Sequence, residues 1–233
     1  MPVALVTGGS AGLGRALTRA LAADGWRVVV DGRDADPLRA VADDPNIVAV
    51  AGDVADDWHR GALGAAVERE GRLDLLVLNA SALGPSPLPA LATATVEDLQ
   101  EVWRTNVAAS LALSADLLPA LAGSRGVLLS ISSDAAVEHY PGWGLYGASK
   151  AALDHLTLTF GEENPDIAAY AVDPGDMRTQ MHQDAFPGED ISDRPLPETV
   201  VPHLLALIAS RPPSGRYRAA EIAVTPSLQR VGA

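Results

Sequence analysis

Tyr146 and Lys150 lie four residues apart in "LYGASKAAL", and together they could exchange a proton with a carbonyl oxygen. The i, i+4 spacing places both side chains on one face of a helix. A phenol has an ordinary pKa of about 10, and a nearby ammonium favours the phenolate and lowers that pKa. Lys150 is also the only lysine in the chain, against sixteen arginines. We interpret the pair as an acid–base pair, the alternative being a solvated pair on a helix surface.

Two further polar residues could serve the same chemistry. Ser133, in "ISS", precedes Tyr146 by thirteen residues, and its hydroxyl could hold a carbonyl oxygen in line with the tyrosine. Asn106, in "RTNVAAS", falls within a predicted helix, where asparagine is a poor helix former. A buried asparagine with satisfied hydrogen bonds is the alternative for Asn106.

The stretch "TGGSAGLG", from Thr7 to Gly14, follows an apolar run and precedes a helical pattern. Glycines at 8, 12 and 14 allow a tight turn and a close backbone approach, and the helix N-terminus offers free N–H groups to a pyrophosphate. This context predicts a dinucleotide site. The alternative is a plain glycine-rich turn.

The elements that must position these residues alternate along the chain. Continuous apolar runs predict strands at 3–7, 27–31, 46–50, 73–78, 126–132 and 167–172, with a last strand within 214–224. Amphipathic segments between them predict helices, among them 14–25, 58–71 and 96–122. We expect an α/β fold: one doubly wound Rossmann-like domain over residues 1–233, with a parallel sheet of about seven strands and helices on both faces.

Composition narrows the classes of function. The net charge of −13 disfavours binding to nucleic acid or to an anionic membrane. The chain has no cysteine, which excludes disulfides and fits a reducing cytoplasm. We expect no signal peptide, since the N-terminus has no basic region, and no apolar stretch approaching the length of a membrane span. We therefore predict a cytoplasmic protein.

The motifs resemble those of the short-chain dehydrogenase/reductase family. The glycine stretch has the family pattern TGxxxGxG, Ser133 matches the family serine, and Tyr146 and Lys150 match YxxxK. The segment "LNASA" (78–82) stands where the family usually has NNAG, and "DPGDMRT" (173–179) matches PGxxxT. Leu78 and Ser81 depart from the family pattern. The resemblance implies Asn106, Ser133, Tyr146 and Lys150 as catalytic residues, with Asn106 perturbing its helix and holding a water. It assigns cofactor binding to Thr7, Gly8, Ser10, Gly12, Leu13, Gly14, Arg33, Asp53, Val54, Asn79, Ala80, Tyr146, Lys150, Pro174, Gly175, Met177 and Thr179.

The end of the second strand, "VVVDGRD", bears on the choice of nicotinamide cofactor. An acid here selects NAD(H) by binding the ribose hydroxyls, whereas an arginine binds the 2′-phosphate of NADP(H). By alignment with the family, Asp31 falls one position early, small Gly32 occupies the discriminating position, and Arg33 matches the phosphate-binding arginine. We therefore favour NADP(H) over NAD(H).

We expect the substrate wall to comprise His139, Tyr140 and Trp143, with Met181, His182 and Phe186 from a substrate loop at about 176–198; ordinary loop packing is the alternative for each. No metal is predicted, because His139 and His182 have no evident third ligand.

The expected function is reduction of a ketone or aldehyde of moderate size, or the reverse reaction, oxidation of the corresponding alcohol. The alternatives are an NAD-dependent alcohol dehydrogenase, a dinucleotide-sensing protein without turnover, and an epimerase or dehydratase acting on nucleotide sugars. The resemblance also implies a homodimer or homotetramer formed through helices 96–122 and 145–161.

Overall fold

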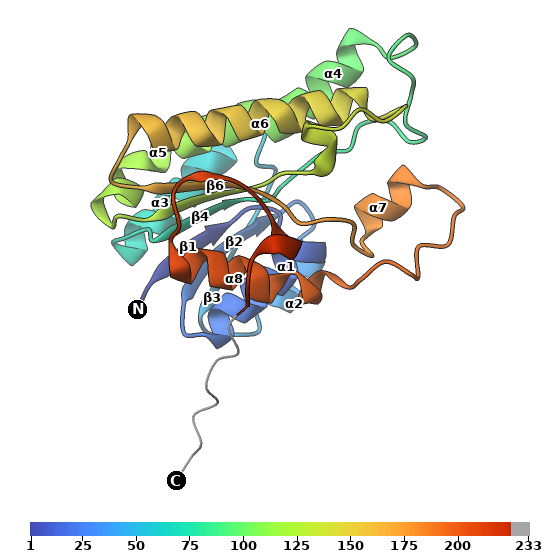
Figure 1. The fold of residues 1–233 in the computed structure, drawn as a ribbon. Coiled ribbons are helices and arrows are strands. Elements are labelled where there is room, and N and C mark those ends of the chain that lie inside the picture. The colour runs from blue at the N-terminus through green and yellow to red at the C-terminus, as the bar shows by residue number, and fades with distance from the viewer. Residues whose placement is uncertain (225–233) are drawn as a thin grey trace.

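The computed structural model describes residues 1–224, and its parallel strands form one sheet in the order β3-β2-β1-β4-β5-β6-β7 (Figure 1). The strands are β1 (Val3–Val6), β2 (Arg27–Gly32), β3 (Ile47–Ala51), β4 (Leu75–Leu78), β5 (Val127–Ile131), β6 (Ala168–Asp173) and β7 (Gly215–Arg218). This is the predicted doubly wound fold. The strand order reverses beside β1, so the carboxyl ends of β1 and β4 border the crevice where such sheets bind ligands.

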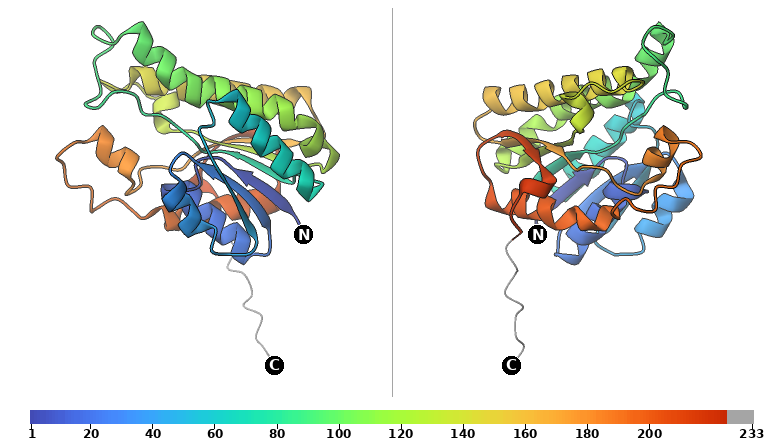
Figure 2. Two further views of the ribbon diagram at one scale, coloured as in Figure 1. Left: turned by 180° about the vertical axis from the view of Figure 1, so that it is seen from behind. Right: turned by 45° about the vertical axis from the view of Figure 1, so that its right-hand side comes forward.

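Helices cover both faces of the sheet (Figures 1 and 2). Three helices pack on one face: α1 (Gly12–Ala23), α2 (Ala35–Val41) and α8 (Val201–Ser210). The other face carries α3 (Asp57–Glu70), α5 (Ala109–Gly123) and α6 (Gly144–Glu163), while α4 (Val96–Trp103) continues the line of α5 beyond the sheet. The short α7 (Gln180–Ala185) stands apart from both layers.

Alternation along β1 explains why its sequence is continuously apolar. Ala4 and Val6 enter the core beneath α1 and α8, whereas Leu5 enters the core beneath α3, α5 and α6. All three residues have no exposed surface. A strand buried on both faces needs apolar side chains at every position, which is the pattern that predicted a parallel sheet.

Two sequence expectations change in detail, and a third concerns residues that the structure does not describe. The last strand covers only Gly215–Arg218 of the predicted 214–224, and a 3₁₀ turn over Ala219–Glu221 follows it. Residues 225–233 of the expected 1–233 domain lie outside the described residues.

By length and composition alone, the continuous helical stretch Val96–Gly123 could cross a membrane, so the expectation that no apolar stretch approaches such a length was wrong. Part of its apolar character comes from α5 residues that pack in the core, among them Leu113, Leu117 and Leu121.

Candidate active site

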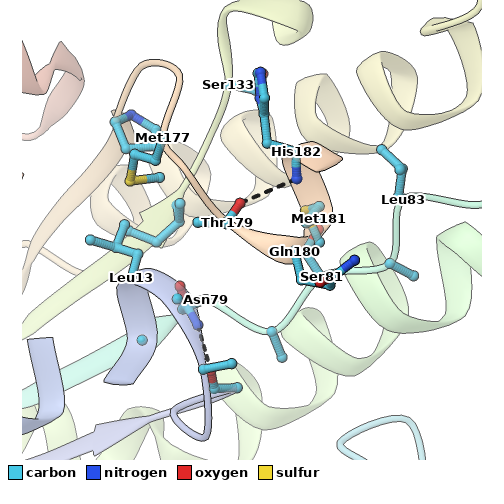
Figure 3. Close-up of a pocket in the computed structure, with 18 of the residues that line it drawn as sticks. Leu13, Asn79, Ser81, Leu83, Ser133, Met177, Thr179, Gln180, Met181 and His182 are labelled. Atoms are coloured by element: carbon cyan, nitrogen blue, oxygen red, sulfur yellow. Dashed lines mark hydrogen bonds between the residues drawn. The ribbon is translucent and has the colours of Figure 1, made fainter. Parts of the chain in front are cut away.

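A cavity of about 740 Å³ opens at the carboxyl end of the sheet. Its wall is built from the glycine loop, the ends of β2, β4 and β5, the start of α6, and the segment that follows β6 (Figure 3). The predicted catalytic and cofactor-binding residues all line this cavity except Thr7 and Asn106. Segments far apart in the sequence therefore meet where the resemblance predicted a single site.

The glycine loop has the geometry that a dinucleotide needs. Gly8 and Gly12 adopt positive φ angles of 66° and 52°, which favour glycine. Helix α1 begins at Gly12, within the glycine-rich stretch, and its N-cap residue Ala11 provides no side-chain cap. No acidic residue lies in its first turn. The first N–H groups of α1 thus remain available to a pyrophosphate, and the residues fit the implied cofactor.

Gly14 is required for a different reason, because the backbone and a side chain approach it closely. A Cβ atom at this position would lie 2.4 Å from the Gly8 carbonyl oxygen and 2.4 Å from Asn79 Nδ2. A side chain would therefore displace the loop itself rather than a flexible neighbour.

We expect Gly14→Ala to weaken cofactor binding by about tenfold or more, because the overpacked loop must move away from its binding geometry. Fluorescence titration with NADPH measures this. Gly61→Ala is the matched control, since a Cβ atom at Gly61 in α3 meets nothing within 4 Å. Equal affinity in both variants would contradict the role given to the loop.

Thr7 and Asn79 support the loop from behind. Thr7 is 2% exposed, and its Oγ1 accepts hydrogen bonds from the backbone N–H groups of Asn79 and Ala80, both at 3.0 Å. Asn79 Nδ2 donates to the carbonyl oxygens of Thr7 and Gly8 at 2.8 and 3.1 Å. The turn after β4 is thereby tied to the glycine loop. Thr7 supports the loop from the interior and is not among the residues that line the cavity, so its part in cofactor binding stays a prediction.

Asp31 is one of the residues that line the cavity, but it is 1% exposed and both of its carboxylate oxygens are engaged. Oδ1 accepts a hydrogen bond of 2.6 Å from the Gly8 N–H, and Oδ2 lies 3.1 Å from His59 Nε2. Asp31 and His59 are both buried. Arg33, two residues later, is exposed at the cavity wall. Sequence reasoning noted Asp31 but missed His59, which gave no local signal because it lies on α3.

Gly32 lies against Ser10, since a Cβ atom at Gly32 would approach Ser10 Oγ to 2.7 Å. Ser10, Gly32 and Arg33 therefore share one part of the cavity wall. Asp53 and Val54 line the cavity after β3. The Asp53 carboxylate accepts a hydrogen bond from the Ala55 N–H at 2.9 Å, so it also serves the turn that its residue type favours.

Tyr146 and Lys150 lie on α6 as the spacing predicted, and both are buried. Lys150 Nζ lies 5.4 Å from the centre of the Tyr146 ring and donates a hydrogen bond of 2.8 Å to the Ile131 carbonyl oxygen. Burial lowers the pKa of Lys150 to about 8. The ammonium is consequently close to losing its proton in the neutral to mildly alkaline range.

The pKa of Tyr146 is raised above its ordinary value, which corrects the expectation that Lys150 lowers it. Burial is the largest cause, and the negative charges of Asp134 and Asp173 add to it. The neighbouring Ser81 hydroxyl acts in the opposite direction. Burial therefore dominates the shift in the pKa of Tyr146, and the phenol keeps its proton at neutral pH.

Ser133 begins a 3₁₀ turn directly after β5. Its Oγ donates to Asp134 Oδ1 at 3.0 Å, and Asp134 Oδ2 accepts a hydrogen bond of 2.9 Å from the Tyr140 hydroxyl. Asp134 and Tyr140 both line the cavity. Sequence reasoning did not single out Asp134, although its position next to Ser133 was a usable signal.

Asn106 perturbs its helix, since Arg104–Ala108 is a π-helical segment between α4 and α5. Its Oδ1 accepts from the Ala82 N–H at 2.7 Å, and its Nδ2 donates to the Ala82 carbonyl oxygen and to Ser149 Oγ, both at 2.9 Å. The Ser81 hydroxyl lies 3.3 Å from Oδ1. The Asn106 side chain therefore holds the segment after β4, and its proposed contact with a water stays a prediction.

The segment after β6 closes the cavity beside the glycine loop. Pro174, Gly175, Met177 and Thr179 line it, and Gly175 has a φ of 74°. Thr179 caps α7 by accepting a hydrogen bond of 3.2 Å from the His182 N–H, as Figure 3 shows. Its Cγ2 atom lies 3.5 Å from the position of a Cβ atom at Gly12. Thr179 is thus close to the loop that would hold the pyrophosphate.

Aromatic rings gather on the remaining wall. Trp143 contacts Tyr146 edge-on with 5.6 Å between ring centres, and it lies 6.0 Å from the ring of Phe186. His182 lies 4.9 Å from Phe186. Met181 and Tyr140 also line the cavity, but His139 does not, which corrects its place in the predicted substrate wall. Within residues 1–224, no group of three or more His, Cys, Asp or Glu side chains is arranged to hold a metal ion.

Comparison with known proteins agrees with this geometry. Residues 2–190 match the family described as short chain dehydrogenase. Serine 3-dehydrogenase of Agrobacterium fabrum is 32% identical over 183 residues, covering 76% of this chain and 72% of the relative. A short chain dehydrogenase structure from Pseudomonas syringae superposes with a TM-score of 0.87 at 34% identity, covering 94% of each chain. A short chain dehydrogenase structure from Escherichia coli, described as complexed with NADPH, superposes with a TM-score of 0.84 at 29% identity, covering 94% of this chain and 96% of that chain.

Proposed function

Since the chain belongs to the short-chain dehydrogenase family and is an oxidoreductase acting on CH–OH or C=O groups, we propose that it is an NADP(H)-dependent carbonyl reductase. Its substrate would be a ketone or aldehyde of moderate size, or the corresponding alcohol in the reverse direction. The observation that carries the proposal is the meeting of Ser133, Tyr146 and Lys150 with the glycine loop on the wall of one cavity.

In this proposal the bound nicotinamide cofactor supplies or accepts the hydride. The Ser133 hydroxyl orients the carbonyl oxygen, and the Tyr146 hydroxyl donates the proton that this oxygen takes up on reduction. The raised pKa of Tyr146 suits a donor in the reductive direction. Lys150 keeps one N–H on the Ile131 carbonyl oxygen, so two remain for a ribose hydroxyl and for proton supply.

The surroundings of Asp31 support the preference for NADP(H). An acid that selects NAD(H) must have carboxylate oxygens free for the ribose hydroxyls. Those of Asp31 are engaged by Gly8 and His59. Arg33 makes no hydrogen bond or ion pair with the other residues of 1–224, and Ser10 lies beside Gly32 on the same wall. The NADPH complex of the Escherichia coli relative points the same way.

We expect Arg33→Ala to raise the KM for NADPH by about ten- to a hundredfold and to change the KM for NADH little, because a charge-assisted contact to the 2′-phosphate is lost. Initial rates with each cofactor measure this. Arg39→Ala is the control, since Arg39 is an exposed arginine on α2 that pairs with Asp36 and does not line the cavity. A wild-type preference for NADH would refute the Arg33 argument.

We place the substrate against the aromatic wall formed by Trp143, Phe186 and His182, with residues 176–198 as the substrate loop of the one domain. A panel of ketones and aldehydes, followed through the loss of NADPH absorbance, tests the activity. Binding of NADPH without turnover of any compound would instead favour a dinucleotide-sensing role.

The proposal includes a homodimer or homotetramer formed through the long helices α4–α5 and α6. Exposed apolar side chains on the first of these include Leu111, which is 44% exposed, and Trp103. Light scattering during size-exclusion chromatography measures the number of subunits.

A further inference from the structure

Behind the predicted catalytic residues, side chains from α6 hold the end of β5. Lys150 Nζ donates to the carbonyl oxygen of Ile131 at 2.8 Å. One turn further along α6, Asp154 Oδ2 accepts a hydrogen bond of 2.7 Å from the Ser132 hydroxyl. Lys150 and Asp154 are both buried. The spacing of Tyr146, Lys150 and Asp154 at i, i+4 and i+8 puts them in one row on the helix face that meets the sheet.

Arg216 completes this arrangement from β7. Its Nη2 donates to the carbonyl oxygen of Ser133 at 2.8 Å, and its Nε pairs with Asp154 Oδ2 at 3.0 Å. A second acid, Asp173 at the end of β6, lies 3.8 Å from Nη2. Three consecutive residues at the end of β5 are thus each bound by a different charged side chain. The last of the three is Ser133.

The Asp154 carboxylate uses only one of its two oxygens, Oδ2, for hydrogen bonds among residues 1–224. Its Oδ1 is buried without a hydrogen-bond partner among residues 1–224. Burial raises the pKa of Asp154, while Ser132, Arg216 and Lys150 oppose that rise. In turn, the charge of Asp154 opposes the lowering of the Lys150 pKa by burial. The two groups on α6 therefore stabilise each other's charged forms.

We propose that Asp154 and Arg216 form a positioning pair behind the active site, in which Arg216 holds Ser133 in place and Asp154, one turn from Lys150 on the same helix face, provides that ammonium with a neighbouring negative charge. The pair rests on the roles proposed above for Ser133, Tyr146 and Lys150. The ionisable groups in this part of the site are Tyr146 and Asp154 on the helix of Lys150, Asp134 and Asp173, whose charges act on Tyr146, and Arg216, which pairs with Asp154. Of these, Asp154 is the acid that raises the pKa of Lys150 against its burial.

Asp154→Asn tests the charge. With the carboxylate gone, Lys150 loses its proton at lower pH, so the high-pH limb of kcat for ketone reduction moves down by roughly one pH unit. We would measure kcat at saturating NADPH and ketone for wild type and variant over a range of about 4 to 5 pH units, from about pH 5.5 to about pH 10, which covers the low-pH and high-pH limbs of the profile. A limb at the wild-type position in a folded variant would overturn this part of the proposal.

Arg216→Gln tests the hold on Ser133. We expect kcat to fall by about tenfold, with the dissociation constant for NADPH unchanged, because Ser133 is displaced while the glycine loop is not. Arg216→Lys keeps a charge near Asp154 and should recover part of kcat. These two variants also decide the proposal if Asp154→Asn does not fold.

Arg218→Gln is the matched control. Arg218 lies on the same strand, half exposed, with its Nε 4.0 Å from Asp173 Oδ2, and it bonds to neither Ser133 nor Asp154. We expect its kcat and pH profile to match wild type. If Arg216→Gln lowers only the melting temperature, leaving kcat like that of Arg218→Gln, the pair is structural and the proposal fails. Tyr146→Phe in the same assay tests the proposed function separately. If Tyr146→Phe keeps its turnover, the proposed function fails, and not only the role of the Asp154–Arg216 pair.

Discussion

Tyr146→Phe is expected to lower kcat for ketone reduction by about 100- to 10,000-fold, the range that a general acid contributes. The change removes only the hydroxyl, and the buried ring keeps its edge-on contact with Trp143. Folding and the glycine loop should therefore be unaffected, and the dissociation constant for NADPH should change little. Steady-state kinetics and a fluorescence titration measure the two quantities.

Tyr140→Phe is the control for Tyr146→Phe. Tyr140 also lines the cavity, and its hydroxyl donates to Asp134. It is 44% exposed, whereas Tyr146 is 8% exposed. Loss of this hydroxyl should leave most of the turnover intact. Retained activity in Tyr146→Phe, or an equal loss in Tyr140→Phe, would contradict the assignment of the proton donor.

Lys150→Arg is expected to lower kcat by about a hundredfold although the positive charge is kept. The Lys150 side chain is 1% exposed and reaches the Ile131 carbonyl oxygen with a compact ammonium. A planar guanidinium is larger, presents its donors in a rigid fork and remains protonated, whereas burial brings the pKa of Lys150 to about 8. The variant therefore does not fit the same space, and its rigid fork does not keep the bond to the Ile131 carbonyl oxygen while leaving donors free for a ribose hydroxyl.

Arg39→Lys serves as the reference for an exchange between these two residue types at an exposed site. It should leave kcat at the wild-type value. Circular dichroism and the melting temperature of Lys150→Arg separate loss of folding from loss of chemistry. Near-normal kcat in Lys150→Arg would mean that the single lysine of the chain has no chemical significance.

Local patterns were enough to predict the frame of the site. Continuous apolar runs predicted the parallel strands, because a strand covered on both faces is apolar at every position. The helical period placed Tyr146 and Lys150 on one face of α6, and the glycines placed a turn before α1. In each case the informative residues are close in sequence, so backbone geometry alone relates them.

The pKa of Tyr146 shows where such reasoning ends. A neighbouring ammonium was expected to lower it, but burial beneath the aromatic wall raises it. Burial depends on which segments cover the tyrosine, and Ser81 and Asp173, which also shift its pKa, come from distant parts of the chain. The sign of the shift could therefore not be obtained from the YxxxK spacing.

Partners far apart in the chain were likewise decided by the tertiary structure. Asp31 meets His59 because α3 packs under β2, and Arg216 meets Asp154 because β7 joins the sheet beside β6. These contacts span 28 and 62 residues, and no local periodicity encodes them. The amino-acid sequence alone identified the fold, the glycine loop and the residues expected to do chemistry. Only packing of the whole sheet determined which buried charges surround them, because electrostatic environment depends on distance in space and on exclusion of water.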